Sequence, residues 1–157
     1  MTSDLAVYIL ARTDLPSMNP GKMAAQVHHA GVQMMTLFYN HRTALVREYL
    51  DQGLAQGANG FNTTIVLGAS LNQIYVAGDK ASDLRYIFKH VTDPSYPFVV
   101  DAEIAKLIPE TDGTKIVKVL DNGKVLMVRE ELTCSWFIGD RNDVIFRSLF
   151  DGLDLHP

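Results

Sequence analysis

Residues 7–32 have the sequence VYILARTDLPSMNPGKMAAQVHHAGV, in which a strand pattern gives way to a helix pattern. The apolar run LAVYILA at residues 5–11 predicts a strand buried on both faces of a sheet. Asn19 and Pro20 predict a helix start, because an asparagine side chain accepts hydrogen bonds from the free amides of the first turn and proline suits the first helical position. Apolar residues then recur at spacings of three and four, so the helix is expected to continue to about Tyr39.

The next part of the chain predicts a helix, a loop and a hairpin. A helix is expected at residues 43–50, with Gly53 as its stop, followed by a glycine-rich loop at residues 54–62. The β-rich segments 63–69 and 74–77 flank a Ser-Leu-Asn-Gln tetrapeptide, and this arrangement predicts a hairpin.

Elements of both kinds follow. Apolar residues at helical spacing predict a helix at residues 81–91, and a short buried strand is expected at 96–101, where it ends in a carboxylate. Another strand is expected at 133–138, before a closing helix at 142–151 with Asn142 as its cap.

A second hairpin has the strongest local signal in the chain. Asp121-Asn122-Gly123 is a typical hairpin turn, and it separates the β-rich segments 115–120 and 124–129. Because strands alternate with helices along the chain, we expect an α/β layered fold with a mostly parallel sheet. Residues 1–157 are expected to form a single domain.

Composition excludes several classes of protein. The longest apolar run has seven residues, whereas a membrane span needs about 20. No basic region precedes that run. We therefore expect no secretory signal and no membrane segment, and we expect the protein to be cytoplasmic. Cys134 is the one cysteine, which excludes a disulfide framework and a cysteine-based zinc site. The net charge of −4 argues against a protein that coats DNA, but it is compatible with a local basic patch.

Candidate functional residues gather on the first predicted helix. Lys22, Gln26 and His29 are spaced to share one face of it, and Lys22 lies in the first turn, where free backbone amides favour an anion. Ligands of α/β sheets bind beyond the carboxyl ends of strands, which adds Asp101 as a candidate. Spacing alone is also compatible with a solvated lysine, a packing histidine and a turn aspartate. Cys134 is expected to be a buried structural thiol rather than a nucleophile.

The residues quoted above resemble the opening of the type II peptidyl-tRNA hydrolase family. That opening has a buried strand, Arg-x-Asp-Leu, a short loop and Gly-Lys-x-Ala-Ala-Gln-x-x-His-Ala. The matching residues here are Arg12, Asp14, Leu15, Gly21, Lys22, Ala24, Ala25, Gln26, His29 and Ala30. Weaker likenesses follow at Asp101-Ala102, at Gly113-Thr114, and at Thr133 with Ile138-Gly139.

The resemblance implies a three-layer α/β/α sandwich around a mixed, mostly parallel sheet, with the two hairpins as additions. It also implies hydrolysis of the ester between a peptide, or an N-blocked amino acid, and tRNA, without a metal or organic cofactor. Lys22, His29 and Asp101 would be the catalytic residues. The substrate-binding residues would be Arg12, Asp14, Gln26, Thr114 and Thr133.

The resemblance also concerns partners. The partner would be tRNA. We also expect a homodimer, and we expect no association with a membrane. The basic residues expected to form a local patch for tRNA are Arg12, Lys22, Arg85, Lys89 and Lys106.

Two alternatives stay open. Where the family has a glycine and a threonine after Asp-Ala, this chain has Glu103 and Ala105. Because that threonine assists the family's aspartate, a catalytically impaired relative that binds tRNA or a protein is the first alternative. A hydrolase of another ester or amide is the second.

Overall fold

The computed structural model describes residues 4–41, 43–55, 62–109 and 114–156. Its centre is a sheet with the strand order β2-β1-β5-β3, and β4 pairs with β5 off this path. The strands are β1 (Leu5–Arg12), β2 (Thr63–Ala69), β3 (Ile87–Asp101), β4 (Lys115–Val119) and β5 (Lys124–Asp140). The predicted first strand is confirmed, because seven of the eight residues of β1 are buried.

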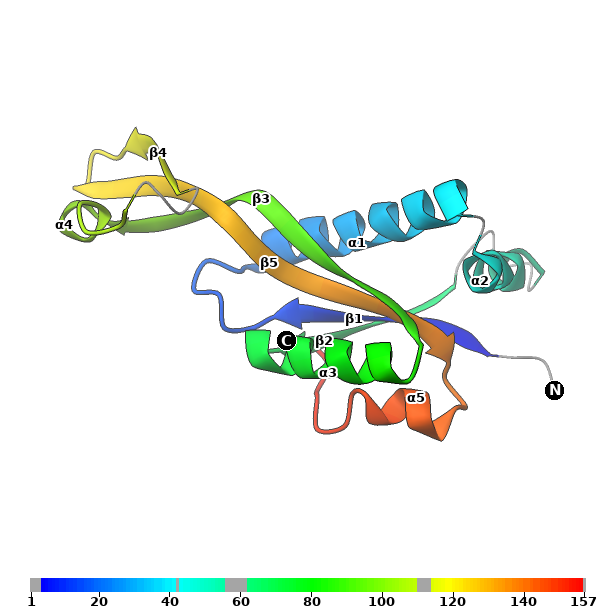
Figure 1. Ribbon diagram of the computed structural model, residues 1–157. Coiled ribbons are helices and arrows are strands. Elements are labelled where there is room, and N and C mark those ends of the chain that lie inside the picture. Colours follow the sequence, from blue (N-terminus) through cyan, green and yellow to red (C-terminus); the bar gives the residue numbers. More distant parts are fainter. Residues whose placement is uncertain (1–3, 42, 56–61, 110–113, 157) are drawn as a thin grey trace.

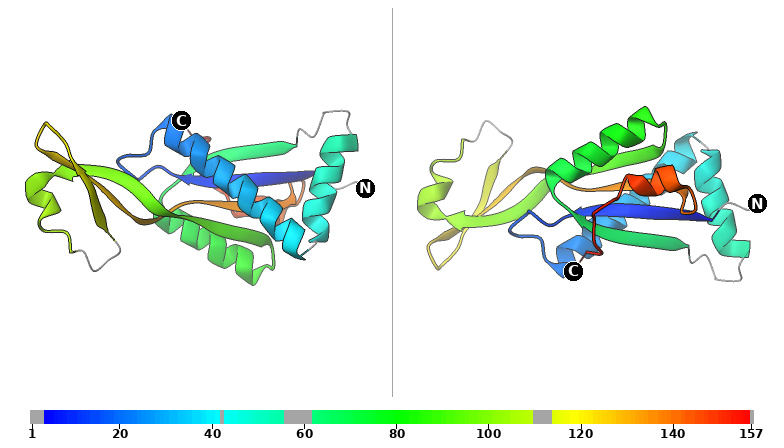
Figure 2. Two further views of the ribbon diagram at one scale, coloured as in Figure 1. Left: turned by 90° about the horizontal axis from the view of Figure 1, so that it is seen from above. Right: turned by 90° about the horizontal axis from the view of Figure 1, so that it is seen from below.

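Helices cover both faces of the sheet, as expected for an α/β/α sandwich. They are α1 (Pro20–His41), α2 (Ala44–Ala55), α3 (Leu71–Asp83), α4 (Ala102–Ala105) and α5 (Val144–Ser148). In Figure 2, α1 and α2 lie over one face, and α3 and α5 lie over the other. Each face has its own hydrophobic core, one around Trp136 with Met34 of α1 and the other around Phe137 with Phe146 of α5.

The sheet is mixed, but the expectation that it is mostly parallel is wrong. Among the strands of the described residues, β1 and β2 alone pair in parallel, whereas β1–β5, β3–β5 and β4–β5 are antiparallel. The physical reason is that the tight turn at Gly123 joins β4 and β5 as an antiparallel hairpin, and β5 then lies between β1 and β3 and runs opposite to both.

The first helix begins as predicted. The Asn19 side chain accepts a hydrogen bond from the Lys22 backbone amide at 2.9 Å, and Pro20 is the first helical residue. The second helix runs to Ala55, so the expected stop at Gly53 is wrong. Gly53 instead lies against Asn62, where a Cβ atom would be 1.8 Å from the amide oxygen. Most of the glycine-rich loop, residues 56–61, lies outside the described residues.

The hairpin expected at residues 63–77 is wrong in its second half. β2 pairs with β1 in parallel, and the residues after it form α3. Ser70 caps this helix: its side chain accepts from the Gln73 backbone amide at 3.3 Å, and the Gln73 side chain accepts from the Ser70 backbone amide at 2.8 Å. The Ser-Leu-Asn-Gln tetrapeptide is therefore a capping box rather than a turn.

The helix expected at residues 81–91 is also wrong, because α3 ends at Asp83 and β3 begins at Ile87. Arg85 has a φ of 61°, and the Tyr86 amide donates to the carbonyl of Ala81 at 2.8 Å. These are the features of a Schellman motif, which usually has glycine at the left-handed position. Because this position holds arginine instead of glycine, the sequence lacks the usual signal for the end of a helix.

The distal halves of β3 and β5 form an arm that projects beyond the body of the molecule in Figure 1. It also carries α4 and β4, and we call residues 94–109 and 114–130 the arm. The predicted hairpin is confirmed, with Gly123 at a φ of 75° in its turn. A small core of Ala105, Val125 and Met127 holds the arm together.

The last helix is shorter than expected. It spans Val144–Ser148, and its cap is Asp143 rather than Asn142, since the Asp143 side chain accepts from the Ile145 amide at 2.8 Å. Gly139 of β5 lies under the Phe146 ring, which a Cβ atom would meet at 2.8 Å.

Within the described residues, no helix is both long and apolar enough to span a bilayer.

Candidate active site

Lys22 lies in the first turn of α1 and points toward β3. Its Nζ donates to the carbonyl oxygen of Pro97 at 2.8 Å and lies 4.9 Å from the centre of the Tyr96 ring. Burial lowers the pKa of the Lys22 ammonium below its usual value, and the negative charge of Asp93 partly offsets this effect. Lys22 is therefore a partly desolvated cation with a carboxylate nearby, not the solvated lysine of the alternative interpretation.

Asp93 is the carboxylate at this site, and sequence reasoning missed it. The pairing of β3 with β5 shifts register between Val91 and Thr92 and again between Asp93 and Tyr96. Such bulges re-aim side chains and are common beside active sites. Asp93 Oδ2 accepts from Gln26 Nε2 at 2.9 Å, and its Oδ1 accepts from the Ser95 amide at 2.9 Å.

A buried threonine completes this chain of hydrogen bonds. The Thr133 hydroxyl donates to Gln26 Oε1 at 2.7 Å, and it also lies 3.2 Å from the Val91 carbonyl oxygen. Thr133 is 0% exposed and Gln26 is 4% exposed. Because the Gln26 amide has one fixed partner on each side, it holds the carboxylate of Asp93 in one orientation. We call Lys22, Gln26, Asp93 and Thr133 the polar cluster.

His29 lies beside this cluster on α1. It is exposed, and it lines a pocket of about 250 Å³ together with Gln26 and Asp93. Gln26 and His29 meet at this pocket, whereas Lys22, one turn before Gln26 on α1, lines a different one.

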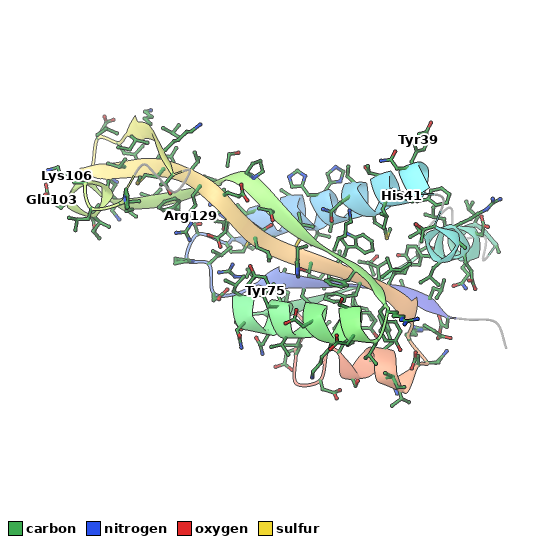
Figure 3. All side chains as sticks on the ribbon, viewed as in Figure 1. Tyr39, His41, Tyr75, Glu103, Lys106 and Arg129 are labelled. Atoms are coloured by element: carbon green, nitrogen blue, oxygen red, sulfur yellow. The ribbon has the colours of Figure 1, made fainter. Side chains whose placement is uncertain are left out.

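The structure does not bring Asp101 to the cluster, so that expectation is wrong. Asp101 ends β3 and pairs with Lys124 near the tip of the arm. It follows Pro97, the contact of Lys22, by four strand residues or about 13 Å. Figure 3 shows the neighbouring Glu103 and Lys106 at the far end of the arm, and Arg129 near its base. The reason for the miss is the length of β3. It runs in the same direction as β1, and Ala11 and Val91 both pair with Cys134, but β3 continues along the arm to Asp101, far beyond the end of β1.

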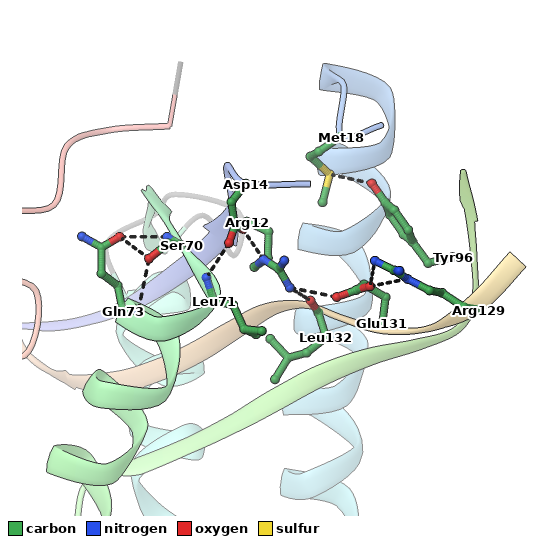
Figure 4. Close-up of polar contacts among 10 residues, drawn as sticks. All are labelled: Arg12, Asp14, Met18, Ser70, Leu71, Gln73, Tyr96, Arg129, Glu131 and Leu132. Carbon is green, nitrogen blue, oxygen red and sulfur yellow. Dashed lines mark hydrogen bonds and ion pairs between the residues drawn. The ribbon is translucent and has the colours of Figure 1, made fainter. Parts of the chain in front are cut away.

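Arg12 and Asp14 order the loop before α1. Arg12 Nε is paired with Asp14, and another guanidinium nitrogen donates to Glu131 Oε1 and to the Leu132 carbonyl, both at 2.9 Å (Figure 4). Asp14 also accepts from the Leu71 amide at 3.1 Å, which joins the loop to the start of α3. Burial acts to raise the pKa of Asp14, but the hydrogen bonds from Arg12 and Leu71 and the charge of Arg12 together outweigh it, so the pKa lies below its ordinary value.

The expected basic patch does not form. Arg12 is 5% exposed and is occupied by its two carboxylate partners. Lys106 is paired with Glu103 on the arm at 2.7 Å. Lys89 lies near the start of β3, eight residues or about 26 Å along the strand from Pro97, which Lys22 contacts.

A groove of about 580 Å³ lies next to Lys22, between the loop before α1 and the arm. Leu15, Pro16 and Ser17 form one side of it, and residues 96–100 of β3 form the other. Leu126, Arg129 and Ile108 complete the lining. We call it the arm groove.

Other candidate residues lie elsewhere. Thr114 is buried just before β4, on the arm rather than in the polar cluster. Cys134 is 0% exposed, and burial raises the pKa of its thiol to about 12, as expected for a structural thiol. His90 Nδ1 lies 2.6 Å from Ser135 Oγ, but Ser135 is 0% exposed and so is out of reach of a substrate. No three His, Cys, Asp or Glu side chains come together for a metal ion in the part of the chain that the structure describes.

The amino-acid sequence of the chain matches a family of known proteins. Residues 5–96 match the family described as "Peptidyl-tRNA hydrolase PTH2". The chain belongs to this family. Proteins named peptidyl-tRNA hydrolase from Saccharolobus islandicus strains L.S.2.15 and M.14.25 are each 33% identical over 85 residues, which cover 54% of this chain and 68% of theirs.

The peptidyl-tRNA hydrolase match contains Lys22, Gln26, His29 and Asp93 but ends before Asp101. Most of the arm also lies beyond it. A solved protein of unknown function from Agrobacterium aligns over 98% of both chains with 10% identity and a TM-score of 0.40. That likeness is too distant to carry a conclusion.

Proposed function

We propose that the chain hydrolyses the ester bond between a peptide, or an N-blocked amino acid, and the 3′ end of tRNA. The observation that carries this proposal is the hydrogen-bonded chain from Thr133 through Gln26 to Asp93, with Lys22 beside it. Ester hydrolysis needs a base that activates a water and a positive group for the oxyanion. The Asp93 carboxylate can serve as the base and the Lys22 ammonium as the positive group.

The roles follow from the contacts. Asp93 would accept a proton from the attacking water, since each of its oxygens has one protein donor and a further lone pair. Lys22 would stabilise the negative charge that develops on the carbonyl oxygen of the ester. Gln26 and Thr133 are positioning residues, because they act through Asp93. His29 lines the pocket in front of Asp93, where it would hold the water or the substrate.

Ala105 does not weaken this proposal. The impaired-relative alternative rested on the absence of a hydroxyl partner for Asp101. Ala105 is buried in the core of the arm, away from the cluster. Asp93 has its hydroxyl partner in Thr133, by way of Gln26. A binding module without turnover and a hydrolase of another ester or amide therefore become outcomes of the test.

The remaining expectations are part of the same proposal. The partner is tRNA, the location is the cytoplasm and a second copy forms a homodimer. Sedimentation of the purified protein tests the last of these directly.

The test is release of N-acetyl-amino acid from N-acetyl-aminoacyl-tRNA by the purified protein, compared with the Lys22→Ala variant. The loss of an oxyanion-stabilising group should lower kcat by about 100- to 1,000-fold. A wild-type protein that binds tRNA without hydrolysis would favour the binding module. If it cleaves a simple N-acetyl-amino acid ester equally fast, the tRNA is not the preferred substrate.

A further inference from the structure

We propose that the arm groove binds the peptide side of the substrate and selects apolar residues next to the scissile ester. The inference rests on the proposed function, because it assigns the acyl part of the same ester. It names a specificity-determining subsite that is built mainly by residues outside the family match.

The position of the groove is the first argument. Lys22 belongs to the polar cluster and also lines the arm groove. An ester whose carbonyl oxygen faces the Lys22 ammonium can therefore place its acyl side chain in the groove without leaving the cluster. The groove holds about 580 Å³, within the range of roughly 300–1,000 Å³ that ligand pockets usually have.

The chemistry of the lining favours an apolar occupant. Leu15, Pro16, Val100, Ile108 and Leu126 present hydrocarbon surface to it. The polar groups at its edge already have partners. Ser17 Oγ and Lys22 Nζ donate to the Pro97 carbonyl at 3.1 and 2.8 Å, and Arg129 is paired with Glu131 at 2.6 Å.

The same contacts argue against the tRNA end as the occupant. Unpaired bases bind proteins by stacking on open aromatic rings, and phosphates need a free cation. Lys22 lies over the Tyr96 ring, which is 2% exposed. Arg129 lies 5.0 Å from the centre of the Phe98 ring, which also packs against the core of the arm. Both rings are thus covered, Arg129 is paired with Glu131, and Lys22 is assigned to the carbonyl oxygen of the ester, which leaves no ring or cation of this lining for a base or a phosphate.

The arm makes this subsite a property of this chain. The lining residues from Pro97 onward all follow the family match, which ends at residue 96. Val99 offers a clean probe, since it lines the groove and is 49% exposed, so a polar side chain there leaves the core intact. Val117 of β4 is 56% exposed on the same arm and does not line the groove, which makes it a matched control.

The experiment measures kcat/KM on one tRNA that carries N-acetyl-leucine, N-acetyl-glycine or N-acetyl-lysine. The wild type should prefer leucine over glycine by roughly 10- to 100-fold, as apolar pockets do for a few methylenes. Val99→Asp should lower the leucine-to-lysine ratio by at least about tenfold, whereas Val117→Asp should leave it unchanged. Binding of the peptide N-acetyl-Leu-Leu, followed by titration calorimetry, should weaken in Val99→Asp only.

The outcomes separate the two proposals. Hydrolysis with no preference among the three acyl groups, and no effect of Val99→Asp, would overturn the subsite and leave the hydrolase standing. Peptide binding that is lost in Val99→Asp, in a protein without hydrolysis, would support the groove and reject the hydrolase. Equal changes in Val99→Asp and Val117→Asp would overturn the subsite, because they would mark a general effect on the arm.

Discussion

Thr133 reaches the proposed reacting carboxylate through a single amide side chain. Its hydroxyl sits in the bulge between the Val91–Cys134 and Thr92–Leu132 pairs, and it fixes Gln26, which fixes Asp93. A β-bulge on β5 is therefore coupled to a bulge on β3 by way of α1. The coupling makes the geometry of the site sensitive to one methyl-for-hydroxyl exchange.

Thr133→Val should remove this coupling while preserving the shape of the residue. Gln26 Oε1 would lose its donor in a buried site, which costs about 1–3 kcal/mol of unfolding free energy. If about 1.4 kcal/mol of the coupling is realised in the transition state, kcat should fall by about tenfold. Urea unfolding and steady-state turnover measure the two effects, with Thr133→Ser as the control that keeps both. Wild-type turnover in Thr133→Val would show that Asp93 does not depend on Thr133.

The site could be predicted only in part. Lys22, Gln26 and His29 are set by helical spacing, which is local, so the sequence was sufficient for them. Asp93 precedes Pro94, and an aspartate before a proline resembles a turn. Its approach to Gln26 depends on the register shifts of β3, which no spacing along the chain encodes. The signal that was available is the pair Pro94 and Pro97, since prolines in a strand mark edges and bulges.

At the scale of elements, Tyr86 joins the start of β3 to the last helix. Its hydroxyl donates to Asp143 Oδ2 at 2.6 Å, and Asp143 caps α5. Burial is the main cause that raises the pKa of Tyr86 to about 12, so the phenol stays a donor at neutral pH. The same hydrogen bond lowers the pKa of Asp143 below its ordinary value of 3.8.

Tyr86→Phe should destabilise the fold by about 1–2 kcal/mol at neutral pH, since it removes a hydrogen bond to a charged group. The contribution of Asp143 is present above its ordinary pKa and is lost as the pH falls through the lowered folded-state value. The difference in unfolding free energy between wild type and Tyr86→Phe should therefore shrink below about pH 4. Urea unfolding between pH 7 and pH 3 measures it. A difference that stays constant over this range would contradict the assigned role of the carboxylate.

The elements that were predicted correctly are those whose start, end or turn is marked by residues close together in the sequence. β1 is one apolar run, α1 has an Asn-Pro start, and the β4–β5 hairpin has Asn-Gly in its turn. The α3–β3 segment failed because its two boundaries are unusual. Ser70 and Gln73 form a capping box that resembles a turn, and Arg85 takes a position that glycine normally fills. β2 pairs with β1 rather than with the segment that follows it in the chain. This pairing depends on tertiary contacts, which a local sequence pattern does not reveal.

At the scale of the whole molecule, charge limits how tRNA can bind. The chain carries a net charge of −4, so any contact with phosphates has to come from local cations. Lys115, Lys118 and Lys124 are exposed on the arm. Phosphate contacts at the arm would come from lysines such as these.

Binding of tRNA should therefore weaken steeply with salt, because phosphate contacts release counterions. Filter binding between 50 and 200 mM salt should show a falling affinity, while circular dichroism shows an unchanged fold. Lys118→Ala removes one candidate phosphate contact, so it should reduce the magnitude of the slope of log affinity against log salt concentration by about 1. An affinity that stays flat over this range would indicate a ligand other than nucleic acid.

We propose that Asp93, not Asp101, is the carboxylate that takes part in the reaction. Both lie on β3, so Asp93→Asn and Asp101→Asn form a matched pair that removes one charge from the same strand. Steady-state hydrolysis of N-acetyl-aminoacyl-tRNA by the two variants tests the claim most directly. We predict that Asp93→Asn lowers kcat by about 100- to 10,000-fold, with Asp101→Asn close to wild type. Severe loss in Asp101→Asn with normal turnover in Asp93→Asn would contradict the account.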